Sequence, residues 1–380
     1  MNTPRIEALW QQSKVVLADC ALPNGAIVAA NTDHPAYPAL GEDYRRGWER
    51  DAAFQLVGAH VLEMSNAPDI RDNHLHWLTE RAEGVAETGV ITKRYATNGS
   101  LDWRYGPDYQ PDQAGTLLWA LTETQSHPDP LADKTIRLLA NGLVSQWAGT
   151  HFGRPTQDLW ENRSTDTVTG DVLTYSVSAA IHGLGQAIEH WRGKTGEVDT
   201  WEESRNSMLA VLASDRKGEH YLRKISPVED PDNTLDASLD GLTYPFSDLG
   251  PETLSRREET VRAIGRELCT LPDGVTRYVG DTYDGIVRPE GGEATAGRWP
   301  LLTFWHVIAL NRIGQAEKAQ ELYHATIERL DDLYKDQVLP NNLIPEQLFA
   351  DERQGKAILP LAWPHAMFAL ATKELNLNIV

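Results

Sequence analysis

Short and long connections between helical segments alternate along the whole chain, and this alternation limits the fold more than any other feature. Apolar residues recur at helical spacing in twelve segments, whereas the alternating pattern of a strand is almost absent. The connections after even-numbered segments are short, as at 65–67 and Gly314, and those after odd-numbered segments are long. The twelve segments lie near 3–19, 51–64, 68–85, 112–125, 131–147, 173–192, 199–213, 234–243, 251–268, 299–313, 315–331 and 361–374, and the eighth has the weakest pattern.

A ring of antiparallel helix pairs accounts for this alternation, because it collects all long connections at one end. The segments 51–64 and 299–313, which begin at that end, are the more apolar ones, as inner helices should be, and their partners are amphipathic. We therefore predict an all-α fold, an (α/α)6 barrel of twelve helices that forms a single domain over 1–380. The long connections on one rim, which should form a pocket, are 20–50, 86–111, 148–172, 214–233, 269–298 and 332–360.

The composition argues against several classes of function. The net charge of -20 disfavours nucleic acid, because phosphate binding needs clustered lysine and arginine. No apolar run of about 18 residues exists, so we expect no membrane span. The N-terminus has the pattern of an amphipathic helix and not of a signal peptide, which predicts a cytoplasmic protein. The only cysteines, Cys20 and Cys269, make neither a disulfide framework nor a zinc site, and we expect no metal and no cofactor.

Aromatic and charged residues gather in the long connections. Twelve tryptophans are present, and flat aromatic faces pack well against the C–H faces of sugars. Trp103 and Tyr105 lie in the second long connection. At the end of the first long connection, Arg50 offers several N–H donors and Asp51 offers a carboxylate acceptor. This pair suits the binding of vicinal hydroxyls. Alternatively, Asp51 caps the second helix and Arg50 is a surface partner.

Two glutamates of the rim, Glu161 and Glu346, come from opposite parts of the predicted ring. Hydrolysis of a glycosidic bond needs one carboxylic acid beside the leaving oxygen and one carboxylate that attacks or activates water. We expect Trp160 to shield Glu161 from water and to keep it protonated. A close cation would oppose that role, so Arg163 should point towards another carboxylate or the sugar. Alternatively, Glu161 is an ordinary residue at the start of a helix with a surface partner.

Five motifs carry a resemblance to a known family. In this order, YRRGWERDAAF, QPDQAG, DLWENR, TRYVGDTYDG and IPEQ resemble the glucoamylase-type enzymes of glycoside hydrolase family 15, over roughly residues 40–370. The resemblance implies an inverting enzyme with Glu161 as general acid, Glu346 as general base and Tyr44 near the attacking water. The substrate-binding residues that it implies, with Trp363 added from the start of the last helix, are Trp48, Arg50, Asp51, Trp160, Arg277, Trp299 and Trp363.

The resemblance predicts an exo-acting enzyme that releases β-glucose from the non-reducing end of a short α-glucoside, of the isomaltose or maltooligosaccharide type. A trehalase and a catalytically inactive sugar-binding protein are the alternatives. A phosphorylase would need a phosphate site in place of one carboxylate. The stretch GIVRPEGGEATAGR before Trp299 is longer and more polar than the family leads one to expect, so the bond specificity stays open. A small oligosaccharide is the expected partner.

Overall fold

The computed structural model describes residues 3–102, 109–125, 128–214, 218–227, 234–288 and 294–377. Trp103 and Tyr105 of the predicted rim, and residues 289–293 of the polar stretch before Trp299, lie outside these ranges. The described part is mostly helical and forms the (α/α)6 barrel that the loop alternation predicts. None of the described helices combines the length and the hydrophobicity that a membrane crossing needs.

Among the described residues, six helical elements form the inner ring, and each begins at the rim where the long connections meet. They pack in the order α2, α5, α7, η1, α10 and α12, and α12 returns to α2 to close the ring. Their bounds are α2 (Glu49–Val61), α5 (Pro111–Thr124), α7 (Thr174–Trp191), η1 (Ala237–Leu242), α10 (Pro300–Arg312) and α12 (Ala362–Glu374).

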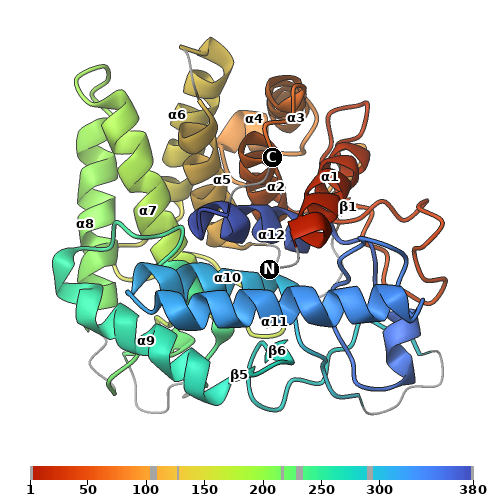
Figure 1. Cartoon of the computed structure of the whole chain (residues 1–380). Helices are drawn as coiled ribbons and strands as arrows, with labels where there is room; N and C mark the ends of the chain where they lie inside the picture. Colours follow the sequence, from red (N-terminus) through yellow and green to blue (C-terminus); the bar gives the residue numbers. More distant parts are fainter. Residues whose placement is uncertain are drawn as a thin grey trace.

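Six further helices surround this ring, and each packs on an inner neighbour. Figure 1 shows α11 lying along α10 and α8 lying beside α7. The first helix packs against the last, α12, so the two ends of the chain complete the barrel together. The outer helices are α1 (Thr3–Cys20), α3 (Ala67–Glu80), α6 (Pro130–Ser145), α8 (Val198–Ser214), α9 (Leu254–Glu267) and α11 (Ala316–Lys335).

Short elements stiffen the connections. In the part of the chain that the structure describes, three antiparallel pairs of two-residue strands join β1 to β2, β3 to β4, and β5 to β6. The first pair ties the connection that precedes α2 to the one that precedes α5. The bounds are β1 (Arg46–Gly47), β2 (Tyr95–Ala96), β3 (Val172–Leu173), β4 (Lys224–Ile225), β5 (Cys269–Thr270), β6 (Gly274–Val275), α4 (Val85–Thr88), η2 (Pro251–Thr253) and η3 (Glu352–Lys356).

The eighth predicted helix is wrong in type: the structure has the short 3-10 helix η1 in its place. Asp236 caps η1 by accepting a hydrogen bond from the backbone of Ser238. A Cβ on Gly241 would lie 2.7 Å from the ring of Tyr175, so only glycine lets this turn pack so closely. Pro245 follows soon after, and residues before a proline avoid helical geometry, which explains why η1 does not grow longer.

Aromatic rings fill the inner ring below the rim. The ring of Phe54 on α2 lies 5.3 Å from that of Trp119, 5.3 Å from that of Trp305 and 5.1 Å from that of Trp363. All four side chains are buried. Aromatic pairs at such distances add to the hydrophobic stabilisation of a core. Because Trp363 stacks on Phe54, the floor of any site at this rim is held rigidly.

Candidate active site

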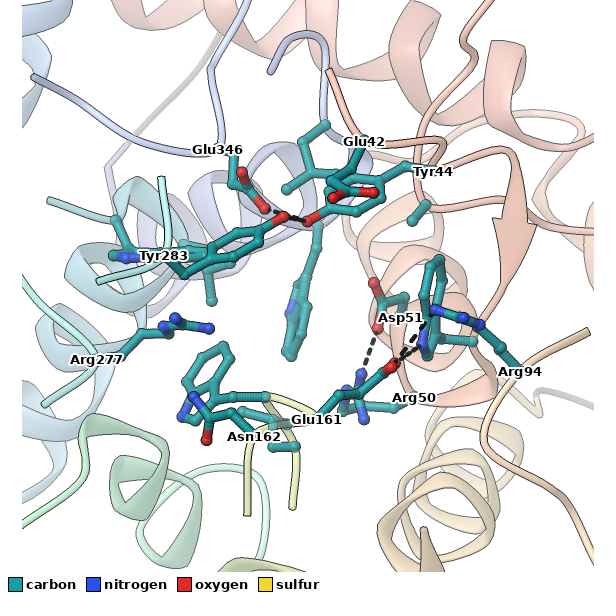
Figure 2. A pocket seen from close by; sticks show the side chains of 18 of the residues that line it. Glu42, Tyr44, Arg50, Asp51, Arg94, Glu161, Asn162, Arg277, Tyr283 and Glu346 are labelled. Carbon is teal, nitrogen blue, oxygen red and sulfur yellow. Dashed lines mark hydrogen bonds and ion pairs between the residues drawn. The ribbon is translucent and has the colours of Figure 1, made fainter. Parts of the chain in front are cut away.

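A cavity of about 530 Å³ opens at the rim, a size typical of small-molecule sites. Its walls come from the long connections and from the first turns of the inner helices α2, α10 and α12. Figure 2 shows Glu346 and Tyr44 on one side of this cavity and Glu161 and Arg94 on the other. All the site residues predicted from the sequence line it: Tyr44, Trp48, Arg50, Asp51, Trp160, Glu161, Arg277, Trp299, Glu346 and Trp363.

Glu346 is almost completely buried and is held by a tyrosine. The hydroxyl of Tyr44 donates to Oε1 of Glu346 at 2.8 Å, and the hydroxyl of Tyr283 forms a short hydrogen bond with that of Tyr44. Burial raises the pKa of Glu346 to about 7, and the Tyr44 hydrogen bond and the charge of Arg277 act in the opposite direction. Glu346 is therefore a carboxylate that can accept a proton near neutral pH.

A glycine leaves the space that the Glu346 carboxylate occupies. A Cβ on Gly285 would lie 2.6 Å from Oε2 of Glu346, closer than any real contact. Gly285 also has a φ of +71°, in the left-handed region that side chains disfavour. Both observations require glycine at this position beside the carboxylate.

Glu161 lies in a tight loop that Asp158 organises. Oδ1 of Asp158 accepts from the backbone N–H groups of Asn162 at 2.9 Å and of Arg163 at 3.1 Å. Within this loop Glu161 has a φ of +59°, a conformation that costs a residue other than glycine free energy. Such strain persists only where the surroundings impose it, and here it points the side chain of Glu161 into the cavity.

The partners of Glu161 differ from those expected. The indole N–H of Trp48 donates to Oε1 of Glu161 at 2.6 Å. Trp160, the expected shield, lines the same cavity, and its indole N–H donates to Asp236 at 3.0 Å. The residues Lys93 and Arg94 each place a nitrogen 3.4 Å from Oε2 of Glu161.

Two cations therefore lie beside Glu161, although the expected role of Glu161 as an acid argued against a close cation, and sequence reasoning missed them. Lys93 and Arg94 come from the long connection that precedes α5, in the run Thr-Lys-Arg-Tyr-Ala. The presence of two adjacent basic residues in this connection is the signal from which sequence reasoning could have predicted cations in the site. Arg163, close to Glu161 in sequence, donates to the carbonyl of Asn162, and its guanidinium lies 5.9 Å from the ring centre of Tyr278.

Arg50 and Asp51 form a buried polar pair in the first turn of α2. Arg50 binds Asp112 at 3.0 Å and Asp51 at 3.2 Å. Burial raises the pKa of Asp51 to about 6, although the charge of Arg50 opposes this. The alternative reading of a surface arginine and a capping aspartate is wrong, because both side chains are buried and Trp48 occupies the N-cap position.

Arg277 is a second buried cation in the cavity wall. Asp281 holds it through two hydrogen bonds, of 2.7 Å to Nε and 2.5 Å to Nη2. Its guanidinium also lies 5.2 Å from the ring centre of Trp160 and 4.8 Å from that of Trp299. A planar cation fixed between aromatic rings keeps its remaining donors available to oxygen atoms in the cavity.

The described residues contain no group of three or more histidine, cysteine, aspartate or glutamate side chains that could hold a metal ion. The polar groups of the cavity include carboxylates, guanidinium groups, phenols, an amide and a hydroxyl, set among indole rings. This combination suits a ligand with many hydroxyl groups and apolar C–H faces, which is the character of a sugar.

Two glutamates that face one aromatic cavity at the rim of an (α/α)6 barrel are an arrangement typical of enzymes that cleave glycosidic bonds. The sequence matches the profile of glycosyl hydrolases family 15 over residues 7–368. The chain belongs to this family.

Several relatives match most of this chain in sequence. An uncharacterized glycosyl hydrolase of Methanocaldococcus jannaschii is 26% identical over 97% of this chain and 56% of its own length. A trehalase of Mycolicibacterium smegmatis is 26% identical over 79% of this chain and 46% of its own length. The chain thus spans about half of each of these two relatives. An isomaltose glucohydrolase of Kribbella flavida is 22% identical, over 95% of this chain and 94% of its own length.

Solved structures share the fold. A wild-type glycosidase superposes with a TM-score of 0.73 at 18% identity, over 98% of both chains. A glucoamylase from Saccharomycopsis fibuligera has a TM-score of 0.67 at 14% identity, over 98% of this chain and 95% of its own. At these identities the likeness concerns the fold, and it includes the closed double ring of helices.

Proposed function

We propose that this protein is an exo-acting, inverting glycoside hydrolase that releases β-glucose from the non-reducing end of short α-glucosides. One observation carries the proposal. The carboxylates of Glu161 and Glu346 face a single cavity from opposite walls, and each is held by an aromatic donor, Trp48 for one and Tyr44 for the other. A reaction that needs a proton on one side of a sugar and an activated water on the other fits this arrangement.

In the proposed reaction Glu161 gives its proton to the glycosidic oxygen while the bond from that oxygen to C1 breaks. Glu346 takes a proton from a water molecule, whose oxygen attacks C1 from the opposite face and inverts it. The reaction consumes one water, and the products are β-glucose and the shortened alcohol. Afterwards Glu161 is ionised and Glu346 is protonated, so solvent must return both to their starting states. The position of Tyr44 on Glu346 suits a hydroxyl that also contacts the attacking water.

The substrate-binding roles follow from the buried charges. Arg50 and Asp51 present donors and an acceptor at the start of α2, as hydroxyls of a terminal glucose require. Arg277 adds donors from the opposite wall, beside Trp160 and Trp299. A cavity walled by long connections admits the end of a chain more readily than its middle, which favours exo cleavage.

The relatives favour short substrates. The isomaltose glucohydrolase matches this chain over nearly the whole length of both proteins, which supports a substrate of the isomaltose type. The trehalase relative is more identical but about twice as long, so a trehalase is the second candidate. We take 1–380 as one catalytic domain that acts on a small oligosaccharide, and we keep a cytoplasmic location as a prediction that cell fractionation tests.

A panel of α-linked disaccharides tests the proposal. The wild-type protein should hydrolyse isomaltose or maltose without added phosphate, and faster turnover of trehalose would select the second candidate. The Glu346→Gln variant should lose turnover but still bind the sugar in calorimetry, because the amide keeps the shape of the side chain. Near-normal turnover by this variant would refute the assignment of the base. Binding without hydrolysis by the wild-type protein would indicate a sugar-binding protein instead.

A further inference from the structure

The residues around Glu346, 341–347, form neither helix nor strand and lie between α11 and α12. Their backbone is tied to other connections by hydrogen bonds from Glu346 to Ile358 at 2.8 Å and from Leu348 to Arg298 at 2.7 Å, and contacts with neighbouring helices hold it as well. The hydroxyl of Tyr334 on α11 donates to the carbonyl of Leu343 at 3.0 Å. The backbone N–H of Ile344, two residues before Glu346, donates to Nε2 of His365 on α12 at 3.0 Å. The position of Glu346 therefore depends on side chains outside the cavity.

His365 connects this segment to the first helix of the chain. Its Nδ1 lies 2.9 Å from the hydroxyl oxygen of Ser13 on α1, and this hydroxyl donates to the carbonyl of Leu9 at 2.8 Å. Ser13, Ile344 and His365 have no exposed surface. The residues thus form a buried row of hydrogen bonds that begins on α1 and ends at the backbone of the segment carrying Glu346.

Only one protonation state of His365 satisfies all these bonds. Because Ile344 donates to Nε2, this nitrogen must keep its lone pair, and the proton must be on Nδ1. Nδ1 then donates to Ser13, whose own proton goes to Leu9. Burial lowers the pKa of His365 to about 3, so the ring stays neutral across the pH range of ordinary enzymes. Every donor and acceptor in the row is then paired, and all the hydrogen bonds donate in the direction from Ile344 to Leu9.

We propose that His365 is a positioning residue for the general base: through Ile344 and with its ring oriented by Ser13, it holds the segment that places Glu346 against the attacking water. His365 does not line the cavity, so it acts through the backbone and not on the sugar. Of the residues assigned to sugar binding, Trp363 lies on α12 two positions before His365, and the others lie on other parts of the chain. Loss of the contact should therefore change kcat much more than KM.

Two substitutions at the same position separate this role from simple core packing. In His365→Gln the amide oxygen can reach the place of Nε2 and accept from Ile344. In His365→Asn the shorter side chain can reach Ser13 but not Ile344. The Asn side chain is one methylene shorter and leaves more space, so the Tm of each variant is measured as well and kcat is compared well below it, where a packing defect alone leaves the protein folded. Ser13→Ala, a milder change, tests the row if His365→Asn does not fold.

The inference rests on the proposed function, so the measurements include one that needs no turnover. On the disaccharide that the wild-type protein hydrolyses, His365→Asn should lower kcat by about ten- to a hundredfold, with KM changed less than about threefold, because small misplacements of a reacting group have effects of this size. His365→Gln should stay within about threefold of wild type, and Ser13→Ala should lie between the two.

The second measurement titrates the Glu346 carboxyl by ¹³C NMR in glutamate-labelled protein, with Glu346→Gln to identify its signal. A looser segment admits water and weakens the effect of burial, so the midpoint in His365→Asn should fall below the wild-type value, while His365→Gln should keep it. Equal kcat and equal midpoints in wild type and His365→Asn would overturn the proposal, as would equal losses in both His365 variants. If the wild-type protein hydrolyses no sugar, the proposed function fails, and the titration still tests the role of His365.

Discussion

Removal of the Tyr44 hydroxyl should shift the pH range in which the enzyme works. This hydroxyl donates to Glu346 at 2.8 Å and stabilises its ionised form. Hydrogen bonds to charged groups contribute about 1.5–3 kcal/mol, and one pKa unit corresponds to about 1.36 kcal/mol. In Tyr44→Phe the pKa of Glu346 should therefore rise from about 7 by about one to two units. Because the base must be ionised, the acid limb should move to higher pH by the same amount, which lowers activity at pH 7 by about five- to fiftyfold in addition to any loss from the missing contact with the attacking water.

The assay is kcat/KM on the preferred disaccharide as a function of pH, since its acid limb reports groups of the free enzyme. Tyr283→Phe is the matched control. It removes the phenol that contacts Tyr44 but leaves the bond from Tyr44 to Glu346, so its acid limb should stay within about half a pKa unit of wild type. An acid limb of Tyr44→Phe that stays in place or moves to lower pH would refute this account of Glu346.

Three further changes test other parts of the site and the barrel. Glu161→Gln should lower kcat on disaccharides by about 10²- to 10⁴-fold but much less on α-glucosyl fluoride, whose leaving group needs no proton; equal losses on both substrates would contradict its role as acid. Gly285→Ala should lower kcat at least about tenfold, because its Cβ would meet Oε2 of Glu346 at 2.6 Å. Gly280→Ala, on the same connection with a φ of +80° and no atom within 4 Å, is its control, and equal effects of the two would show that backbone strain alone is responsible. Gly183→Ala should destabilise the fold by about 1–3 kcal/mol, because its Cβ would lie 2.5 Å from a backbone oxygen of α5; an unchanged Tm would contradict the close packing of α5 and α7.

The barrel could be predicted from the sequence because its pattern is local and repeated. Helical periodicity and the lengths of the connections are both read within short windows, and together they determine which ends of the helices share a rim. The prediction of an α-helix in the eighth segment was wrong because tertiary contacts override the local pattern there. The close contact of Gly241 with Tyr175 and the nearby Pro245 favour a short 3-10 helix over the α-helix that the local pattern predicted.

The cavity residues were found through motifs, but their contacts were not. Trp48 and Glu161 are 113 positions apart in sequence, and only the folded ring brings the indole N–H to the carboxylate. Trp160, the sequence neighbour, could be predicted to lie in the same cavity as Glu161, whereas the contact with Trp48 could not be predicted. The cation at Arg94 and the contact of His365 with Ile344 depend in the same way on packing between distant connections, which single motifs do not record.

The most direct test of the central claim is ¹H NMR of the first glucose released from isomaltose, maltose or trehalose, recorded before the anomers equilibrate. If Glu161 protonates the leaving oxygen while Glu346 activates water on the opposite face, the glucose cleaved from the non-reducing end of isomaltose or maltose should appear first as the β-anomer. Initial release of that glucose as the α-anomer would mean retention and would contradict the assigned roles of both carboxylates.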